Sequence, residues 1–178
     1  RITHVDRAAA GLIDAVAEER GHARRVVRPY RGERLPDLDE IRAVIVLGGP
    51  QSAYDDHPFL RDEERFLAEA VDADTPVLAI CLGAQVLTRA LGGTAHPGET
   101  GLEAGIIQVD LTADATSELS GTFFSFHSDS MTPPDGADVL AASERYLQAW
   151  SAGSALAIQF HPEMTLEGIN GLLQIEAP

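Results

Sequence analysis

The sequence contains a single cysteine, no lysine and no long hydrophobic run. One cysteine cannot form an internal disulfide, which favours a reducing compartment. No stretch approaches the roughly 20 apolar residues that a membrane-spanning helix needs, and nothing at the N-terminus resembles a signal peptide. We therefore expect a cytoplasmic protein with no membrane partner.

Basic side chains are also scarce, because 13 arginines face 28 acidic residues and the formal net charge is −15. Nucleic acids and anionic membranes bind basic surfaces, so we expect neither as a partner. His4 and His22 have no ligand-like neighbour at metal spacing, and we interpret them as structural or surface residues. The sequence thus predicts no metal and no cofactor. Its 178 residues and 44% hydrophobic content fit one domain spanning residues 1–178.

The first half of the chain alternates between strand and helix patterns. Continuous apolar runs at 43–47 and 76–80 are typical of parallel strands buried on both faces. Weaker strand patterns occupy residues 1–5 and 23–28. Helical spacing follows each strand in turn, with helices expected around Leu12–Ala17, from Pro58 onward and from Gly83 to Gly92. In the second of these helices, we expect Phe59, Phe66, Leu67 and Ala70 to face the sheet, and Arg61, Asp62, Glu63 and Glu64 to be solvated.

The second half shows strand patterns without intervening helices, which predict a meander of shorter, partly antiparallel strands on or beside the sheet. The last strong strand covers residues 155–160, and no convincing helix follows Glu163. Together these patterns predict an α/β fold with an open, mostly parallel central sheet, helices on both faces and a small antiparallel section. The meander strands are expected at 105–111, 121–126, 137–142 and 146–150.

Cys81 lies between a predicted strand and a predicted helix. Such an elbow lifts the side chain out of the sheet, and the helix N-terminus favours negative charge beside it. A lone buried cysteine is more often a small hydrophobic residue. Position alone therefore leaves a catalytic role for Cys81 open.

His161 and Glu163 follow the last strand and are two residues apart. At that spacing a carboxylate can fix the tautomer of the imidazole and leave its other nitrogen free to accept a thiol proton. A hydrogen-bonded strand-end histidine without catalytic role is the alternative. Gly48–Gly49–Pro50 closes another apolar strand and predicts a bare backbone turn at the carboxyl edge of the sheet, where open α/β folds build their sites.

These motifs in this order resemble a class I (triad) glutamine amidotransferase domain, of the kind found as the glutaminase of GMP synthases. The resemblance runs over nearly the whole chain and also covers Tyr54–Asp55, Glu103–Ala104–Gly105 and His127–Ser128–Asp129. It implies a flavodoxin-like fold and L-glutamine as substrate. It also implies a role for each matching residue: Cys81 as nucleophile, His161 as base, Glu163 as the acid that orients it, Gly49 and Leu82 as oxyanion-hole backbone donors, and Gln85, Ser128 and Asp129 as substrate contacts.

The sequence contains no recognisable domain that could use ammonia, so we expect an acceptor reaction on a separate synthase. Two alternatives stay open. One is a free-standing hydrolase of another γ-glutamyl amide, and the other is a non-catalytic regulatory homologue. The intact Cys81, His161 and Glu163 argue against the latter, and Gln85 with Ser128 and Asp129 favours free glutamine over the former.

Overall fold

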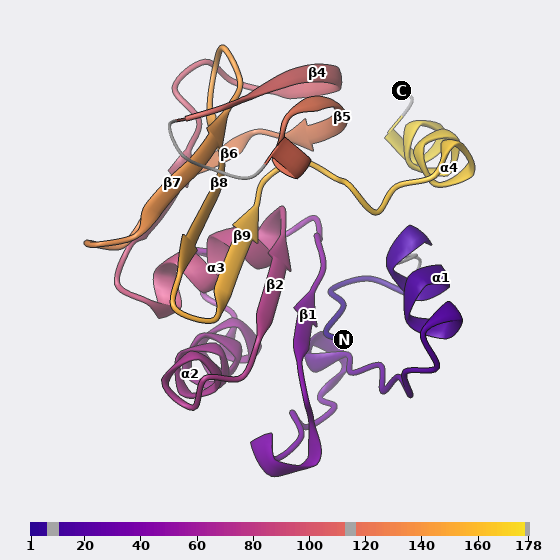
Figure 1. Cartoon of the computed structure of the whole chain (residues 1–178), viewed down its shortest axis with the longest axis vertical. Helices are drawn as coiled ribbons and strands as arrows, with labels where there is room; N and C mark the ends of the chain where they lie inside the picture. Colours follow the sequence, from indigo (N-terminus) through magenta and orange to yellow (C-terminus); the bar gives the residue numbers. More distant parts are fainter. Residues whose placement is uncertain (7–10, 113–116, 177–178) are drawn as a thin grey trace.

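The computed structural model describes residues 1–6, 11–112 and 117–176 (Figure 1). The helices are α1 Gly11–Glu19, α2 Pro58–Asp72, α3 Leu82–Ala90 and α4 Leu166–Glu176, with short 3-10 turns at Pro29–Arg31, Leu38–Glu40 and Ser117–Leu119. The strands are β1 Val44–Val46, β2 Val77–Ile80, β3 Thr94–Pro97, β4 Glu103–Leu111, β5 Gly121–His127, β6 Asp129–Thr132, β7 Asp138–Ala142, β8 Leu147–Ala152 and β9 Ala155–Ile158.

A seven-stranded sheet in the order β1-β2-β9-β8-β7-β4-β5 forms the centre of the molecule, and β3 pairs with β6 in a separate small sheet. The first three strands of this order run parallel, and each later neighbour is antiparallel. The predicted α/β class with an additional antiparallel section is confirmed. The antiparallel strands extend the parallel part rather than lying apart from it, which gives a mixed sheet.

The apolar strands are buried on both faces because each face carries its own helices. Val46 and Ala79 belong to the core formed with α2 and α3. Ile45 and Leu78, at the alternating positions, pack together with Ile13 of α1 against a second buried cluster that contains Leu47 and Ile80. Figure 1 shows α2 and α3 behind one side of the parallel strands, with α1 and α4 at the other side. Alternation along two short strands therefore builds two separate cores.

Three expectations for individual segments are wrong. Residues 1–5 and 23–28 form no strands, and only the single bridges Ile2↔Val27 and Ile2↔Val46 join them to each other and to β1. Arginines crowd the second segment, so it has too few apolar side chains for a full ladder. The chain after Glu163 does form a helix, α4, whose glycines and asparagine hid the helical pattern. Thr165 caps α4, because its Oγ1 accepts a hydrogen bond from the N–H of Gly168 at 3.2 Å.

The prediction that Glu63 of α2 is solvated is also wrong, because its side chain is fully buried. Its partner is a histidine 59 residues earlier in the chain, His4. A helical face pattern contains no information about such a distant partner. Phe66, Leu67 and Ala70 are buried against the sheet as expected.

Gly83 lets α3 pack directly against β1. A Cβ at this position would lie 2.6 Å from the carbonyl oxygen of Val46, and that backbone atom cannot move aside cheaply. We expect Gly83→Ala to lower the free energy of unfolding by about 1–3 kcal/mol, measured by urea denaturation. Gly171→Ala on α4 is the matched control. Nothing lies within 4 Å of its added Cβ, so equal effects in the two variants would contradict this account.

Candidate active site

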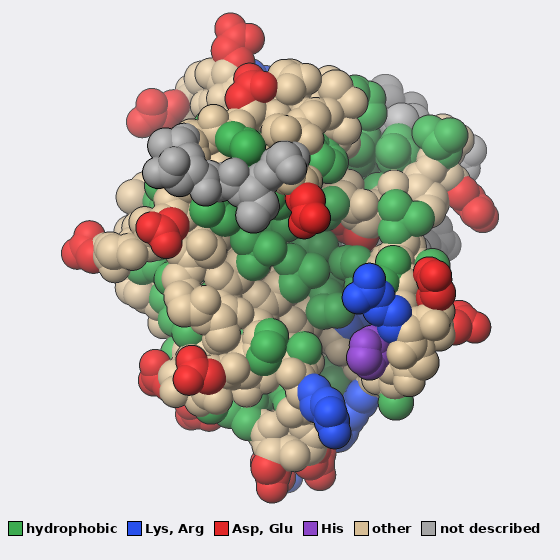
Figure 2. Space-filling model, viewed as in Figure 1, with side chains coloured by type: hydrophobic (Ala, Val, Ile, Leu, Met, Phe, Trp, Pro, Cys, Tyr) green, Lys and Arg blue, Asp and Glu red, His purple; other side chains and the backbone are tan. Residues whose placement is uncertain are grey.

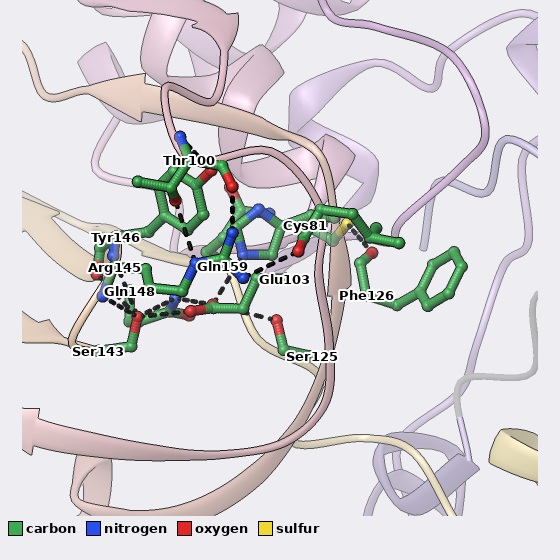
Figure 3. Close-up of polar contacts among 12 residues, drawn as sticks. Cys81, Thr100, Glu103, Ser125, Phe126, Ser143, Arg145, Tyr146, Gln148 and Gln159 are labelled. Carbon is green, nitrogen blue, oxygen red and sulfur yellow. Dashed lines mark hydrogen bonds and ion pairs between the residues drawn. The ribbon is translucent and has the colours of Figure 1, made fainter.

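Cys81 occupies a strained turn between β2 and α3. Its backbone angles, φ 53 and ψ −114, fall in a region that residues with a Cβ rarely adopt. The N–H of Cys81 donates to the carbonyl of Ile158 at 2.8 Å, which ties the turn to β9. Its carbonyl accepts from the N–H of Gln85 at 3.1 Å, which begins α3. The thiol points toward the carbonyl of Phe126 at 4.0 Å (Figure 3).

His161 and Glu163 lie just beyond β9 and contact each other. The Nδ1 atom of His161 is 2.8 Å from Oε1 of Glu163, whose side chain is almost fully buried. Since an ionised carboxylate only accepts hydrogen bonds, Nδ1 donates and Nε2 stays available. The main chain of His161 is fixed by a 2.8 Å hydrogen bond from its N–H to the carbonyl of Phe124. The backbone of Glu163 is held by α1, because its carbonyl accepts from the N–H of Leu12 at 2.9 Å.

The electrostatic surroundings favour a protonated His161. Burial lowers the pKa of its imidazole, but the charge of Cys81 and hydrogen bonds to Cys81 and Glu163 outweigh burial and raise it to about 10. A charge interaction of this kind requires the sulfur and the ring to be close neighbours. The imidazole of His161 is therefore protonated near neutral pH.

Gly48 connects these groups to the end of β1. A Cβ on Gly48 would lie 3.2 Å from Cε1 of His161 and 3.7 Å from the sulfur of Cys81. The glycine turn, the cysteine and the histidine thus lie together at the carboxyl edge of the parallel strands. Gly49 lies next to Leu82, since a Cβ on Gly49 would be 2.9 Å from a methyl carbon of that leucine.

The three residues expected to contact substrate lie close to one another. Gln85 is buried, and its amide nitrogen donates to the carbonyl of Asp129 at 3.3 Å and to Oε1 of Gln159 at 3.1 Å. Asp129 begins β6. Ser128 is exposed, and its carbonyl accepts from the N–H of Gly98 at 2.8 Å. The side chain of Gln85 therefore holds the 128–129 backbone in place.

Sequence reasoning missed the residues that fix the Asp129 carboxylate. Ser52 donates to its Oδ2 at 2.5 Å, and the hydroxyl of Tyr54 donates to its Oδ1 at 3.0 Å. Both lie in the loop that follows Gly48–Gly49–Pro50. Tyr54 belongs to the Tyr54–Asp55 motif of the resemblance, which assigned it no role, and Ser52 was indicated only by its position after the glycine turn.

A network of buried polar contacts that the sequence did not reveal connects the start of β6 to Glu103 (Figure 3). The carboxylate of Glu103 accepts hydrogen bonds from His127 at 3.1 Å, Ser143 at 2.8 Å and Gln148 at 2.7 Å. His127 in turn bonds to the carbonyl of Asp129 through Nδ1 at 2.8 Å. These contacts anchor the start of β6 to β4 and β8.

Two features are absent from the described part of the chain. No helix in that part is long and apolar enough to cross a membrane. No group of three or more histidine, cysteine, aspartate or glutamate side chains there is arranged to hold a metal ion.

Comparison with known families agrees with this geometry. The sequence profile described as glutamine amidotransferase class-I matches residues 9–171. The chain belongs to this family. A relative from Salmonella typhimurium, named glutamine amidotransferase-like protein YfeJ, is 34% identical over 97% of this chain and 78% of its own length. A glutamine amidotransferase from Thermotoga maritima has a solved structure that superposes with a TM-score of 0.92 and 28% identity, over 98% of this chain and 79% of that one.

This class I glutamine amidotransferase domain also matches longer proteins. It is 32% identical to the glutamine-hydrolysing GMP synthase of Pyrobaculum aerophilum, over 87% of this chain and only 30% of the synthase. This chain therefore aligns with less than a third of the length of that synthase.

Proposed function

We propose that this domain hydrolyses the side-chain amide of glutamine through Cys81, His161 and Glu163. The observation that carries the proposal is the position of the only cysteine. It sits in a strained elbow beside a histidine that a buried carboxylate orients. Strain in such a turn is maintained only where the surrounding structure enforces it, and it is concentrated at functional sites.

Each of the three side chains has one role in the reaction. The Cys81 thiolate attacks the amide carbon of glutamine, and negative charge develops on the amide oxygen. The His161 imidazolium then gives its Nε2 proton to the leaving nitrogen, so the C–N bond breaks and ammonia departs. Neutral His161 next removes a proton from water, which attacks the γ-glutamyl thioester and releases glutamate and the thiolate. Glu163 keeps Nδ1 protonated through both steps.

The remaining expected roles belong to the same proposal. The backbone N–H groups of Gly49 and Leu82 stabilise the oxyanion, a contribution of about 10²–10³ in rate per donor. Gln85, Ser128 and Asp129 hold the glutamine, and the carboxylate of Asp129 suits its α-amino group. We also propose that residues 1–178 act as one domain.

Ammonia is proposed to pass to a synthase on another polypeptide. The support comes from the GMP synthases, which carry a matching segment of roughly this size within a much longer protein. On the face shown in Figure 2, acidic side chains are spread around the periphery, and the few basic ones gather near the loop that joins α1 to β1. With a net charge of −15, docking to a comparatively basic partner should weaken as salt is added.

The test is steady-state glutamine hydrolysis by the purified chain, alone and with candidate synthases. We expect the lone chain to be slow, because an oxyanion hole with the Leu82 donor turned away loses about 10²–10³ in rate. Docking should restore that factor. Turnover near the ~10 s⁻¹ typical of enzymes that no partner changes would contradict the dependence on a synthase. Faster cleavage of γ-glutamyl amines than of glutamine would show that glutamine is not the preferred substrate.

A further inference from the structure

A buried pair, His4 and Glu63, lies directly under the loop that carries Gly48 and Gly49. Both side chains have no exposed surface. The Nε2 atom of His4 is 3.1 Å from each carboxylate oxygen of Glu63, and the Nδ1 atom is 3.0 Å from the carbonyl oxygen of Leu47. The reaction steps above do not use either residue. A buried ion pair is also a poor source of stability, because desolvation offsets its attraction.

Hydrogen-bond chemistry defines what His4 does to the loop. A carbonyl oxygen can only accept, so Nδ1 must carry a proton and donate to Leu47. The carboxylate of Glu63 holds the other nitrogen and so fixes the ring plane that aims Nδ1. Burial lowers the pKa of His4, but the charge of Glu63, its hydrogen bond and the backbone of Gly48 and Leu47 raise it above the usual value.

Gly49 packs closely against His4. A Cβ on Gly49 would lie 2.5 Å from Cβ of His4, so the two backbones are in close contact. A Cβ on Gly48 would instead face Cys81 and His161. The N–H and C=O groups of a trans peptide point in opposite directions. Because His4 holds the carbonyl of Leu47, the Gly48 N–H of the same peptide is directed away from His4. The next peptide along the chain carries the Gly49 N–H.

We infer that His4, aimed by Glu63, is a positioning residue. It fixes the Leu47–Gly48 peptide and through it orients the following peptide, which carries the Gly49 N–H, for the oxyanion. This inference rests on the function proposed above. His4 touches no reacting atom, and its effect is exerted through the backbone of Leu47–Gly49.

Two substitutions separate its hydrogen bonds. His4→Asn places an amide nitrogen near the position of Nδ1 and keeps the donor to Leu47, but it loses Glu63. His4→Gln places its amide nitrogen near Nε2 and keeps Glu63, but it loses the donor to Leu47. His22, which is exposed, provides the matched controls His22→Asn and His22→Gln.

The measurements are kcat and KM for glutamine, the melting temperature and the rate of Cys81 alkylation by iodoacetamide, which requires no oxyanion hole. We expect His4→Gln to lower kcat about 10- to 100-fold, a part of the cost of losing one donor, with KM and alkylation unchanged. His4→Asn should keep kcat within about threefold of the wild-type value. It should nevertheless melt at a lower temperature than His4→Gln, because it leaves the buried carboxylate of Glu63 unpaired. If kcat follows melting temperature instead, His4 is merely structural and the inference is overturned. If His4→Asn does not fold, the double variant His4→Asn/Glu63→Gln replaces it.

A readout without turnover separates this inference from the proposed function. In ¹⁵N spectra of the full chain, the Gly49 amide signal should shift in His4→Gln and stay near its native position in His4→Asn. Equal shifts in both variants would overturn the inference even if glutamine is hydrolysed. A wild-type chain that never releases glutamate would instead count against the proposed function, and the Gly49 signal would still decide the role of His4.

Discussion

Replacing Cys81 with alanine should abolish glutamine hydrolysis, with a loss of at least about 10⁴-fold, because no other group can form the thioester. A glutamine-analogue electrophile should attach one label to each wild-type chain and none to Cys81→Ala or Cys81→Ser. The control is denatured wild-type chain with iodoacetamide, which labels its single thiol regardless of fold. Labelling that persists in the serine variant, or hydrolysis that survives in the alanine variant, would contradict the assignment.

The same position allows a stability measurement that a buried, non-catalytic cysteine would not predict. Because φ at Cys81 is 53, a glycine there relieves strain that alanine retains. Cys81→Gly should therefore exceed Cys81→Ala in free energy of unfolding by about 1 kcal/mol, within the usual 1–3 kcal/mol cost of such strain. Gly171→Ala in α4 tests the opposite preference, since a helix favours alanine by about 1 kcal/mol. An alanine variant as stable as the glycine variant would mean that the turn stores no strain.

Replacing Glu163 with glutamine should lower kcat about 10²- to 10⁴-fold and change its pH dependence. The carboxylate is one cause of the raised pKa of His161, so its removal moves that pKa from about 10 down toward 6.5. Proton donation to the leaving nitrogen needs the imidazolium. Activity of the wild type should therefore be lost only as pH rises toward 10, and activity of Glu163→Gln should be lost at lower pH.

Profiles of kcat/KM between pH 6 and 10.5 provide this measurement, with Glu167→Gln as the matched control. Glu167 is an exposed carboxylate on α4, so its loss should leave both the rate and the profile unchanged. An alkaline limb that stays in place in Glu163→Gln would show that the carboxylate does not govern the protonation of His161.

Much of the parallel half of the fold was predictable because its signals are local. The apolar runs at β1 and β2, and the helical spacing after Gly83, each lie within a few consecutive residues. The position of Cys81 between a strand pattern and a helix pattern indicated the elbow in the same way. The spacing of His161 and Glu163 predicted their hydrogen bond, because two residues beyond one strand cannot be far apart.

The contacts that only the tertiary structure decided join residues distant in sequence. The helical pattern predicts that Glu63 lies on a solvated face. Its side chain is buried because it pairs with His4, which lies 59 residues earlier. The carboxylate of Asp129 accepts a hydrogen bond from Ser52, which lies 77 residues earlier in the chain.

The sequence by itself determined the family, the α/β class and the residues that could perform chemistry, because these depend on local pattern and on residue type. The tertiary structure alone decided that the antiparallel strands extend the central sheet, and that His4 and Glu63 support the glycine turn. A buried polar residue looks the same in sequence as a solvated one. Its position depends on whether folding brings a hydrogen-bonding partner to it, and that requires the whole chain.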